Sequence, residues 1–270
     1  MELLNYWVIL LIPAGLILGS FINACIYRMP RKISIVWPGS FCPKCKMSIS
    51  WWQNVPIISF VILKGRCFDC KEKISLMYPL IEVITLFVTV SLFIHFQNFY
   101  SFLFYLFFFS GIIIISGIDI SHRLIPNSLI LIFLLVGIIL NYFFKINSWL
   151  QTVSGLMLAL VFALFLRWST SNLFRKESLG LGDVKLSGLM GCYLGFELFL
   201  FSLFLGSIIG LLFQLFNRRY KKALRTVQVP LAPFLGIGAY LGIILRQLAD
   251  CFTWNSIYLE DWSFFYQFTK

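Results

Sequence analysis

The sequence predicts an all-α polytopic membrane protein of about eight transmembrane helices with a small zinc-ribbon-like cytoplasmic insertion. Three observations support this fold class. Hydrophobic residues make up 60% of the 270 residues, and only 12% are charged, which is typical of membrane proteins. Eight apolar runs approach or exceed the length of about 20 residues that a membrane-spanning helix needs. The one sizeable polar insertion, residues 28–77, contains four of the seven cysteines.

The eight apolar runs are the predicted helices. The first lacks a charged leader and is followed by Arg28, Arg31 and Lys32, so we interpret it as a retained anchor rather than a cleaved signal peptide. The sixth run is short, which makes eight a best count. The runs cover residues 6–27, 78–97, 101–118, 125–144, 150–168, 184–197, 198–216 and 230–248.

The basic residues predict the orientation of these helices. A formal net charge of +11 would indicate nucleic-acid binding if it formed one face of a soluble domain. Here, alternate loops on opposite sides place every Lys and Arg on one side except Lys145, Arg246 and Lys270. The positive-inside rule makes the basic side cytoplasmic. We therefore expect a multi-pass protein of the cell inner or cytoplasmic membrane, with lipid and no nucleic acid among its partners.

Four cysteines predict a metal site in the polar insertion. Cys42 and Cys45 form one CxxC pair, and Cys67 and Cys70 form a second one after 21 intervening residues. This spacing is close to that of zinc ribbons. Two disulfides are the alternative, but the predicted cytoplasmic side is reducing. Four thiolates leave no open position on the ion, so we expect a structural zinc.

Two acids at the ends of apolar runs predict the chemistry. Asp119 closes the third run, and Asp183 lies in the stretch Gly180-Leu181-Gly182-Asp183-Val184-Lys185, at the start of the sixth. Both lie at the predicted cytoplasmic boundary, where ionisable groups are costly and usually functional. Two close carboxylates share a proton, as in aspartic proteases, so that one draws a proton from water while the other polarises the scissile carbonyl. An N-cap role for Asp183 is the alternative, but it would not require Gly180, Gly182 or Lys185, which we expect to support the catalytic loop.

Three further polar residues have two alternative predicted roles each. Glu82, near the start of the second run, either caps the helix or pairs with the basic loop, or it binds a positively charged terminus of the substrate. Asn23 either bonds a neighbouring helix or contacts a ligand. His122 follows Asp119 in a polar turn beside Arg123, where a solvated interface residue is expected rather than a base.

Together these residues resemble a known family, the prepilin peptidases. These are membrane aspartic proteases of the GxGD class, here in their bifunctional form with an N-methyltransferase activity. The resemblance extends over residues 15–238. It is carried by Gly19-Ser20-Phe21 with Asn23, Tyr27-Arg28-Met29-Pro30, the two CxxC pairs, Tyr78-Pro79 with Glu82, Ile118-Asp119, Gly180 to Lys185, and Pro230 to Gly238.

The resemblance implies a function. Asp119 and Asp183 would be the catalytic dyad, and the substrate would be the leader of a type IV prepilin or pseudopilin, cut at the cytoplasmic face. It also implies that S-adenosylmethionine methylates the new amino terminus and that the cysteine loop is needed for this step. Ser121 and Asn127 stand where many relatives have acids, which leaves Asp119 as the first catalytic acid.

Four regions are therefore expected. Residues 1–27 form the first helix, 28–77 the zinc loop, 78–250 the peptidase domain and 251–270 an aromatic extracytoplasmic tail. The alternative function is a proton-coupled transporter. A transporter would need acids deep within its spans, whereas these acids lie at one edge.

Overall fold

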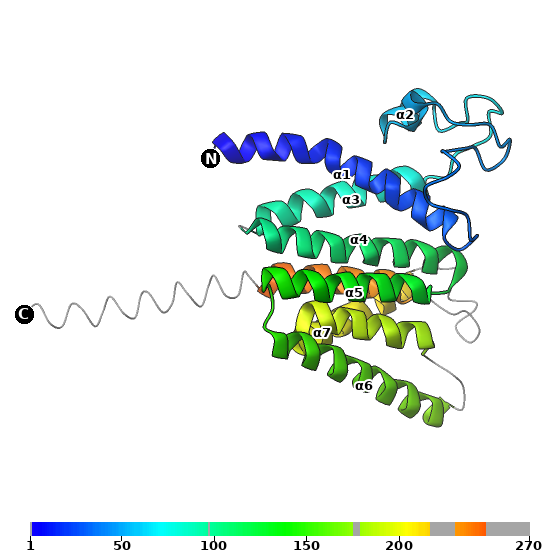
Figure 1. The fold of residues 1–270 in the computed structure, drawn as a ribbon. Coiled ribbons are helices and arrows are strands. Elements are labelled where there is room, and N and C mark those ends of the chain that lie inside the picture. Colours follow the sequence, from blue (N-terminus) through cyan, green and yellow to red (C-terminus); the bar gives the residue numbers. More distant parts are fainter. Residues whose placement is uncertain (1, 97, 175–178, 217–229, 247–270) are drawn as a thin grey trace, which may run out of the picture.

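The computed structural model describes residues 2–96, 98–174, 179–216 and 230–246. The described chain is helical and contains two isolated β-bridges but no strand. Its long helices run side by side, and the segment that carries α2 projects at one end of the bundle (Figure 1). The elements are α1 (Glu2–Arg28), η1 (Trp51–Asn54), α2 (Ile58–Ile62), α3 (Met77–His95), α4 (Phe99–His122), α5 (Asn127–Phe144), α6 (Trp149–Phe174), α7 (Leu181–Phe216) and a last helix, Ala232–Arg246.

The helices confirm a multi-pass membrane protein. Within the described ranges, 6 helices are long and apolar enough to cross a membrane, and Ala232–Arg246 is a shorter apolar helix. One of the six, α7, consists of two helices joined at Gly195, whose φ of 76° and ψ of 169° are not helical. Only glycine adopts this conformation readily. Each of the eight predicted apolar segments thus contains a helix within the described residues, but the break in α7 lies at Gly195 rather than between residues 197 and 198.

Helix boundaries near the two acids also differ from the prediction. α4 continues to His122, where Arg123 ends it in the left-handed conformation with a φ of 54°. Asp119 therefore lies inside the last turn of α4. α7 begins at Leu181, so Asp183 lies in its first turn and is not the residue that caps it. The predicted aromatic tail, residues 251–270, lies outside the described residues.

The core is built around α4. In its most apolar stretch 61% of the residues are buried, against at most 33% in the other spanning helices. Large aromatic side chains fill the space between α4, α5 and α7. Tyr193 packs against Phe104 and Phe108, with ring centroids 4.7 Å apart in both pairs, and its hydroxyl donates to the Phe133 carbonyl at 2.8 Å. This bond satisfies the one polar atom of a side chain that is fully buried, as buried tyrosines require.

Glycines set the distance between α6 and α7. A β-carbon on Gly155 would collide with the carbonyl oxygen of Gly191, and one on Gly191 would collide with the carbonyl oxygen of Gly155. Small residues at such crossings let the backbones of membrane helices approach closely. The pair therefore fixes α6 against the first half of α7, the half that contains Asp183.

The Gly155→Ala variant is expected to be less stable by about 1–3 kcal/mol, because the added methyl group forces the two backbones apart. The measurement is the thermal unfolding midpoint of the purified protein in detergent. Gly39→Ala is the matched control, since a β-carbon there would meet nothing within 4 Å. Equal midpoints for the two variants would contradict the close crossing.

Candidate active site

Asp119 is held by the last helix of the chain. Its side chain is 7% exposed, and its Oδ2 accepts a hydrogen bond from the backbone amide of Ala232 at 3.2 Å. The backbone amide of Leu231 also interacts with this carboxylate. These amides belong to the start of Ala232–Arg246, where helix N–H groups have no partner within the helix and can bond an anion. The start of the last helix is thus the direct partner of Asp119.

Asp183 lies in the first turn of α7, at the same end of the bundle as Asp119. Its side chain is half-buried, and its carboxylate folds back toward Gly180, whose amide is a hydrogen-bond partner. Asp119 and Asp183 interact electrostatically, so the fold brings together two acids that are 64 positions apart in the sequence. Both belong to helix ends at one end of the bundle, which is the arrangement expected from the sequence.

Three contacts position the start of α7, which carries Asp183. Arg167 of α6 donates from Nη1 to the carbonyl oxygen of Leu179 at 2.7 Å. Lys185 donates from Nζ to Oδ1 of Asn127, at the start of α5, at 2.8 Å. A β-carbon on Gly182 would lie 3.0 Å from Cβ of Ile125, so a larger residue would push the loop away from the turn before α5. The chain is therefore held against α6 just before Asp183 and against α5 just after it.

Glu82 and Asn23 join α1, α3 and the polar loop. Oε2 of Glu82 accepts the backbone N–H of Ile57 at 2.8 Å, and Nδ2 of Asn23 donates to the Tyr78 carbonyl at 2.9 Å. A β-carbon on Gly19 would lie 2.7 Å from Cα of Glu82, so α1 and α3 are in close contact here. Each side chain therefore has a hydrogen-bond partner within the protein.

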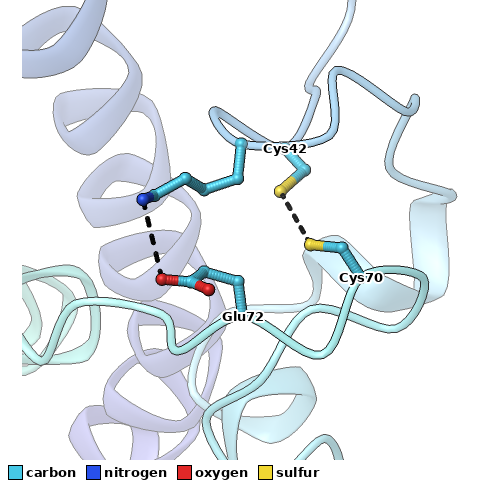
Figure 2. A network of polar contacts seen from close by, with 4 residues as sticks. Cys42, Cys70 and Glu72 are labelled. Atoms are coloured by element: carbon cyan, nitrogen blue, oxygen red, sulfur yellow. Dashed lines mark hydrogen bonds and ion pairs between the residues drawn. The ribbon is translucent and has the colours of Figure 1, made fainter.

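The four predicted cysteines converge on one point. Their sulfur atoms all lie within 4.8 Å of one another, and the Cys42 and Cys70 sulfurs are 3.9 Å apart (Figure 2). Four thiolates at about 2.3 Å around a tetrahedral ion would be about 3.8 Å apart, whereas a disulfide requires about 2.05 Å. All four are free thiols. The donor set therefore fits a metal ion such as zinc.

Each CxxC pair lies in the same type of tight turn. The isolated bridges Phe41–Ser48 and Arg66–Lys73 enclose the two pairs, and Lys46 and Lys71, which follow the second cysteine of each pair, have φ values of 64° and 59°. Burial raises the pKa of the Cys42 thiol, but hydrogen bonds from the backbone of Cys45 and Lys44 prevail and lower it to about 7. The first of the two turns thereby favours the thiolate form of Cys42, the form that binds metals.

Comparison with known proteins identifies the family. A model described as "Bacterial Peptidase A24 N-terminal domain" matches residues 14–96, and one described as "Type IV leader peptidase family" matches residues 106–215. A "Prepilin leader peptidase/N-methyltransferase" of Legionella pneumophila is 30% identical over 89% of this chain and 93% of its own length. The chain belongs to the type IV leader peptidase family.

Two further members of this family are similar over comparable lengths. The "Type 4 prepilin-like proteins leader peptide-processing enzyme" of Escherichia coli is 30% identical over 87% of this chain and 92% of its own. The "Prepilin leader peptidase/N-methyltransferase" of Pseudomonas aeruginosa is 28% identical over 90% and 94%, respectively. No solved structure matches this member of the family.

The sequence reasoning missed two contacts of the leader peptidase site. The contact of the Ala232 amide could not be predicted from residue types, because nearly every residue has a backbone amide. Pro230 and Pro233 indicate only where the last helix begins. Arg167 did leave a signal, since an arginine within an apolar run is costly and usually has a specific partner. Its bond to the Leu179 carbonyl is that partner.

The Lys185→Met variant is expected to lower the peptide-cleaving kcat roughly tenfold or more, because a misplaced catalytic loop costs up to about a hundredfold per ångström. The matched Asn127→Asp variant keeps an acceptor for Lys185 and should retain activity near that of the unmodified chain. Initial rates of leader release across substrate concentrations separate kcat from KM. Full activity of Lys185→Met would show that the contact with Asn127 does not position Asp183.

Proposed function

We propose that this protein is a membrane aspartic endopeptidase that removes the leader of type IV prepilins or pseudopilins at the cytoplasmic face of the inner or cytoplasmic membrane. One observation carries the proposal: Asp119 and Asp183 interact across two helix ends, beside the backbone amides that open the last helix. Membership of the leader peptidase family supports it.

The two carboxylates would work as a pair that shares one proton. The ionised acid takes a proton from a water molecule while the oxygen of that water attacks the scissile carbonyl carbon. At the same time the protonated acid donates its proton to the carbonyl oxygen. As the tetrahedral intermediate collapses, the C–N bond breaks and the leaving amine takes up the proton that the first acid removed from water. A hydroxyl of the intermediate returns its proton to the second acid, so that the pair again holds one proton. The Ala232 amide gives the Asp119 carboxylate a fixed donor and so fixes its orientation.

The substrate fits this position. A prepilin has a short basic leader followed by an apolar helix, so an enzyme that cuts between them needs its acids where a membrane helix begins. Asp119 and Asp183 lie at the ends of membrane helices, at the same end of the bundle as Arg28 and the basic loop. The positive-inside rule makes this the cytoplasmic end.

We further propose that the chain methylates the new amino terminus with S-adenosylmethionine. The names of two relatives include an N-methyltransferase, which supports this proposal. Residues 28–77 would serve this step, and residues 78–250 the cleavage. Cys42, Cys45, Cys67 and Cys70 would hold a zinc ion whose role is structural, since it would fold the loop without an open position for substrate. Glu82 and Asn23, next to this loop, remain candidates for contact with the positively charged product terminus.

Cleavage by the purified full-length protein tests the proposal. In detergent or lipid, it is expected to cut a prepilin-type peptide that contains a basic leader and the following apolar segment, giving two products of defined mass. A proton-coupled transporter would leave the peptide intact. Mass spectrometry of the products also locates the cut, which should separate the leader from the apolar segment.

A further inference from the structure

Apolar side chains gather on one exposed face of the short helix α2. Ile58, Val61 and Ile62 are 56%, 67% and 65% exposed, respectively. Their spacing of three and four residues places them on the same side of the helix. We call these three residues the α2 face. Trp51, in the preceding η1, is 84% exposed. A contiguous apolar surface of this kind is typical of a contact with a partner or a membrane.

The contact between Ile57 and Glu82 places this face at the edge of the membrane. Ile57, the residue before α2, donates its backbone N–H to Glu82. Glu82 is the sixth residue of the spanning helix α3, about 8 Å along its axis from the first residue. The start of α2 is therefore level with the first turns of a membrane helix. Figure 1 shows α2 level with the last turns of α1 rather than beyond them.

A basic cavity adjoins the α2 face. It has a volume of about 510 Å³, and Ile62 belongs both to the cavity and to the α2 face. Lys64, Arg66 and Lys71 supply three positive charges to its lining, while Trp52 and Phe68 supply aromatic rings. None of its lining residues is acidic. A cavity with this lining favours an anion that is attached to an apolar group.

The cations of this cavity are available to a ligand. Within the described loop the recorded ion pair is Lys44–Glu72, at 3.7 Å, and neither residue lines the cavity. Lys71 donates to the Phe68 carbonyl at 2.6 Å and lies over the Phe68 ring, which holds its ammonium group at the cavity. Lys64 and Arg66 thus meet no recorded carboxylate among the described residues.

We propose that this cavity binds the phosphate headgroup of an anionic phospholipid, while the α2 face inserts among the upper parts of the acyl chains. The lipid belongs to the leaflet at this end of the bundle, the inner leaflet in the proposed topology. Basic residues beside a membrane helix are attracted to anionic headgroups, and apolar residues on a short helix insert at the same depth. The lipid thereby anchors the four-cysteine loop on the membrane surface.

Lipid titration of the full-length protein tests this site. The protein in a mild detergent is titrated with phosphatidylglycerol or phosphatidylcholine, and native mass spectrometry measures the bound fraction. The unmodified chain is expected to bind phosphatidylglycerol more tightly than phosphatidylcholine. The double variant Lys64→Gln/Arg66→Gln should bind phosphatidylglycerol roughly twentyfold more weakly, since each cation near an anionic surface contributes about fivefold.

A second double variant, Lys32→Gln/Lys46→Gln, is the matched control, because it removes the same charge from loop residues that do not line the cavity. It should bind phosphatidylglycerol as the unmodified chain does. Val61→Ser/Ile62→Ser should weaken lipid binding while leaving the metal content, measured in the same samples, unchanged. Retained metal shows that a variant with weaker lipid binding still has a folded loop.

Three results would overturn the proposal. The first is equal binding of phosphatidylglycerol by the Lys64→Gln/Arg66→Gln variant and the control variant. The second is that the unmodified chain binds phosphatidylcholine as tightly as it binds phosphatidylglycerol. The third is full displacement of the lipid by soluble glycerol phosphate, which would identify a site for small phosphates rather than for lipid. Failure of prepilin cleavage would not affect these measurements. The lipid site is therefore tested independently of the proposed peptidase activity.

Discussion

Replacing either Asp119 or Asp183 by Asn is expected to lower the rate of leader cleavage by at least about 10²-fold, the usual contribution of one general acid or base. Asparagine has nearly the same shape as aspartate, and its Oδ1 still accepts a hydrogen bond from the Ala232 amide. It cannot exchange the proton that the pair shares. The two single variants should therefore be similarly inactive, and the double variant little worse, because the acids act as a unit.

The measurement is the initial rate of leader release from a prepilin-type peptide. Glu197→Gln is the matched control: Glu197 is an exposed acid of α7 that lies beyond the break at Gly195. It should cleave at the normal rate. Thermal unfolding midpoints close to that of the unmodified chain show that the aspartate variants are folded. Normal cleavage by either aspartate variant would exclude that acid from catalysis.

Loss of the metal is the second large expected effect. The Cys42→Ser/Cys70→Ser variant should purify without bound zinc, because two of the four thiolates are gone and structural zinc contributes roughly 10–16 kcal/mol to the folding of small domains. Transfer of labelled methyl groups from S-adenosylmethionine should be lost with the metal. Leader cleavage should continue, since both aspartates belong to helices α4 and α7 and not to the loop.

Elemental analysis for zinc and the two activity assays check this expectation on the same sample. Cys25→Ser and Cys192→Ser are the controls, because both cysteines are buried among helices and neither belongs to the four-cysteine cluster. They should keep the metal and both activities. Methyl transfer that persists after complete loss of zinc would show that this reaction does not need the metal-bound loop.

The sequence was a good guide where composition and spacing act directly. Apolar runs predicted the helices because the bilayer requires about 20 apolar residues for each crossing. The two CxxC pairs predicted the cysteine cluster because each pair is a local turn. That Asp119 and Asp183 lie at the same end of the bundle could be expected, because both belong to helix ends on the side that basic loops mark.

Other features depend on tertiary contacts that have no local pattern. The break at Gly195 was misplaced by two residues because hydrophobic residues continue on both sides of it. The helical end of α4 at His122 was missed because Asp119 and Ser121 resemble the start of a polar turn. Ser121 instead donates to the Gly117 carbonyl within the helix. The contact from Glu82 to the Ile57 amide joins a spanning helix to a loop, which no single stretch of sequence predicts.

The hydrogen-bond partner of Asp119 lies late in the sequence. Asp119 and Asp183 are synthesised well before Ala232, whose amide bonds the first of them. A nascent chain that has reached only α7 thus carries both acids but not the amide that orients one of them. In the proposed mechanism, the donor that orients Asp119 is therefore present only once the last helix has been synthesised.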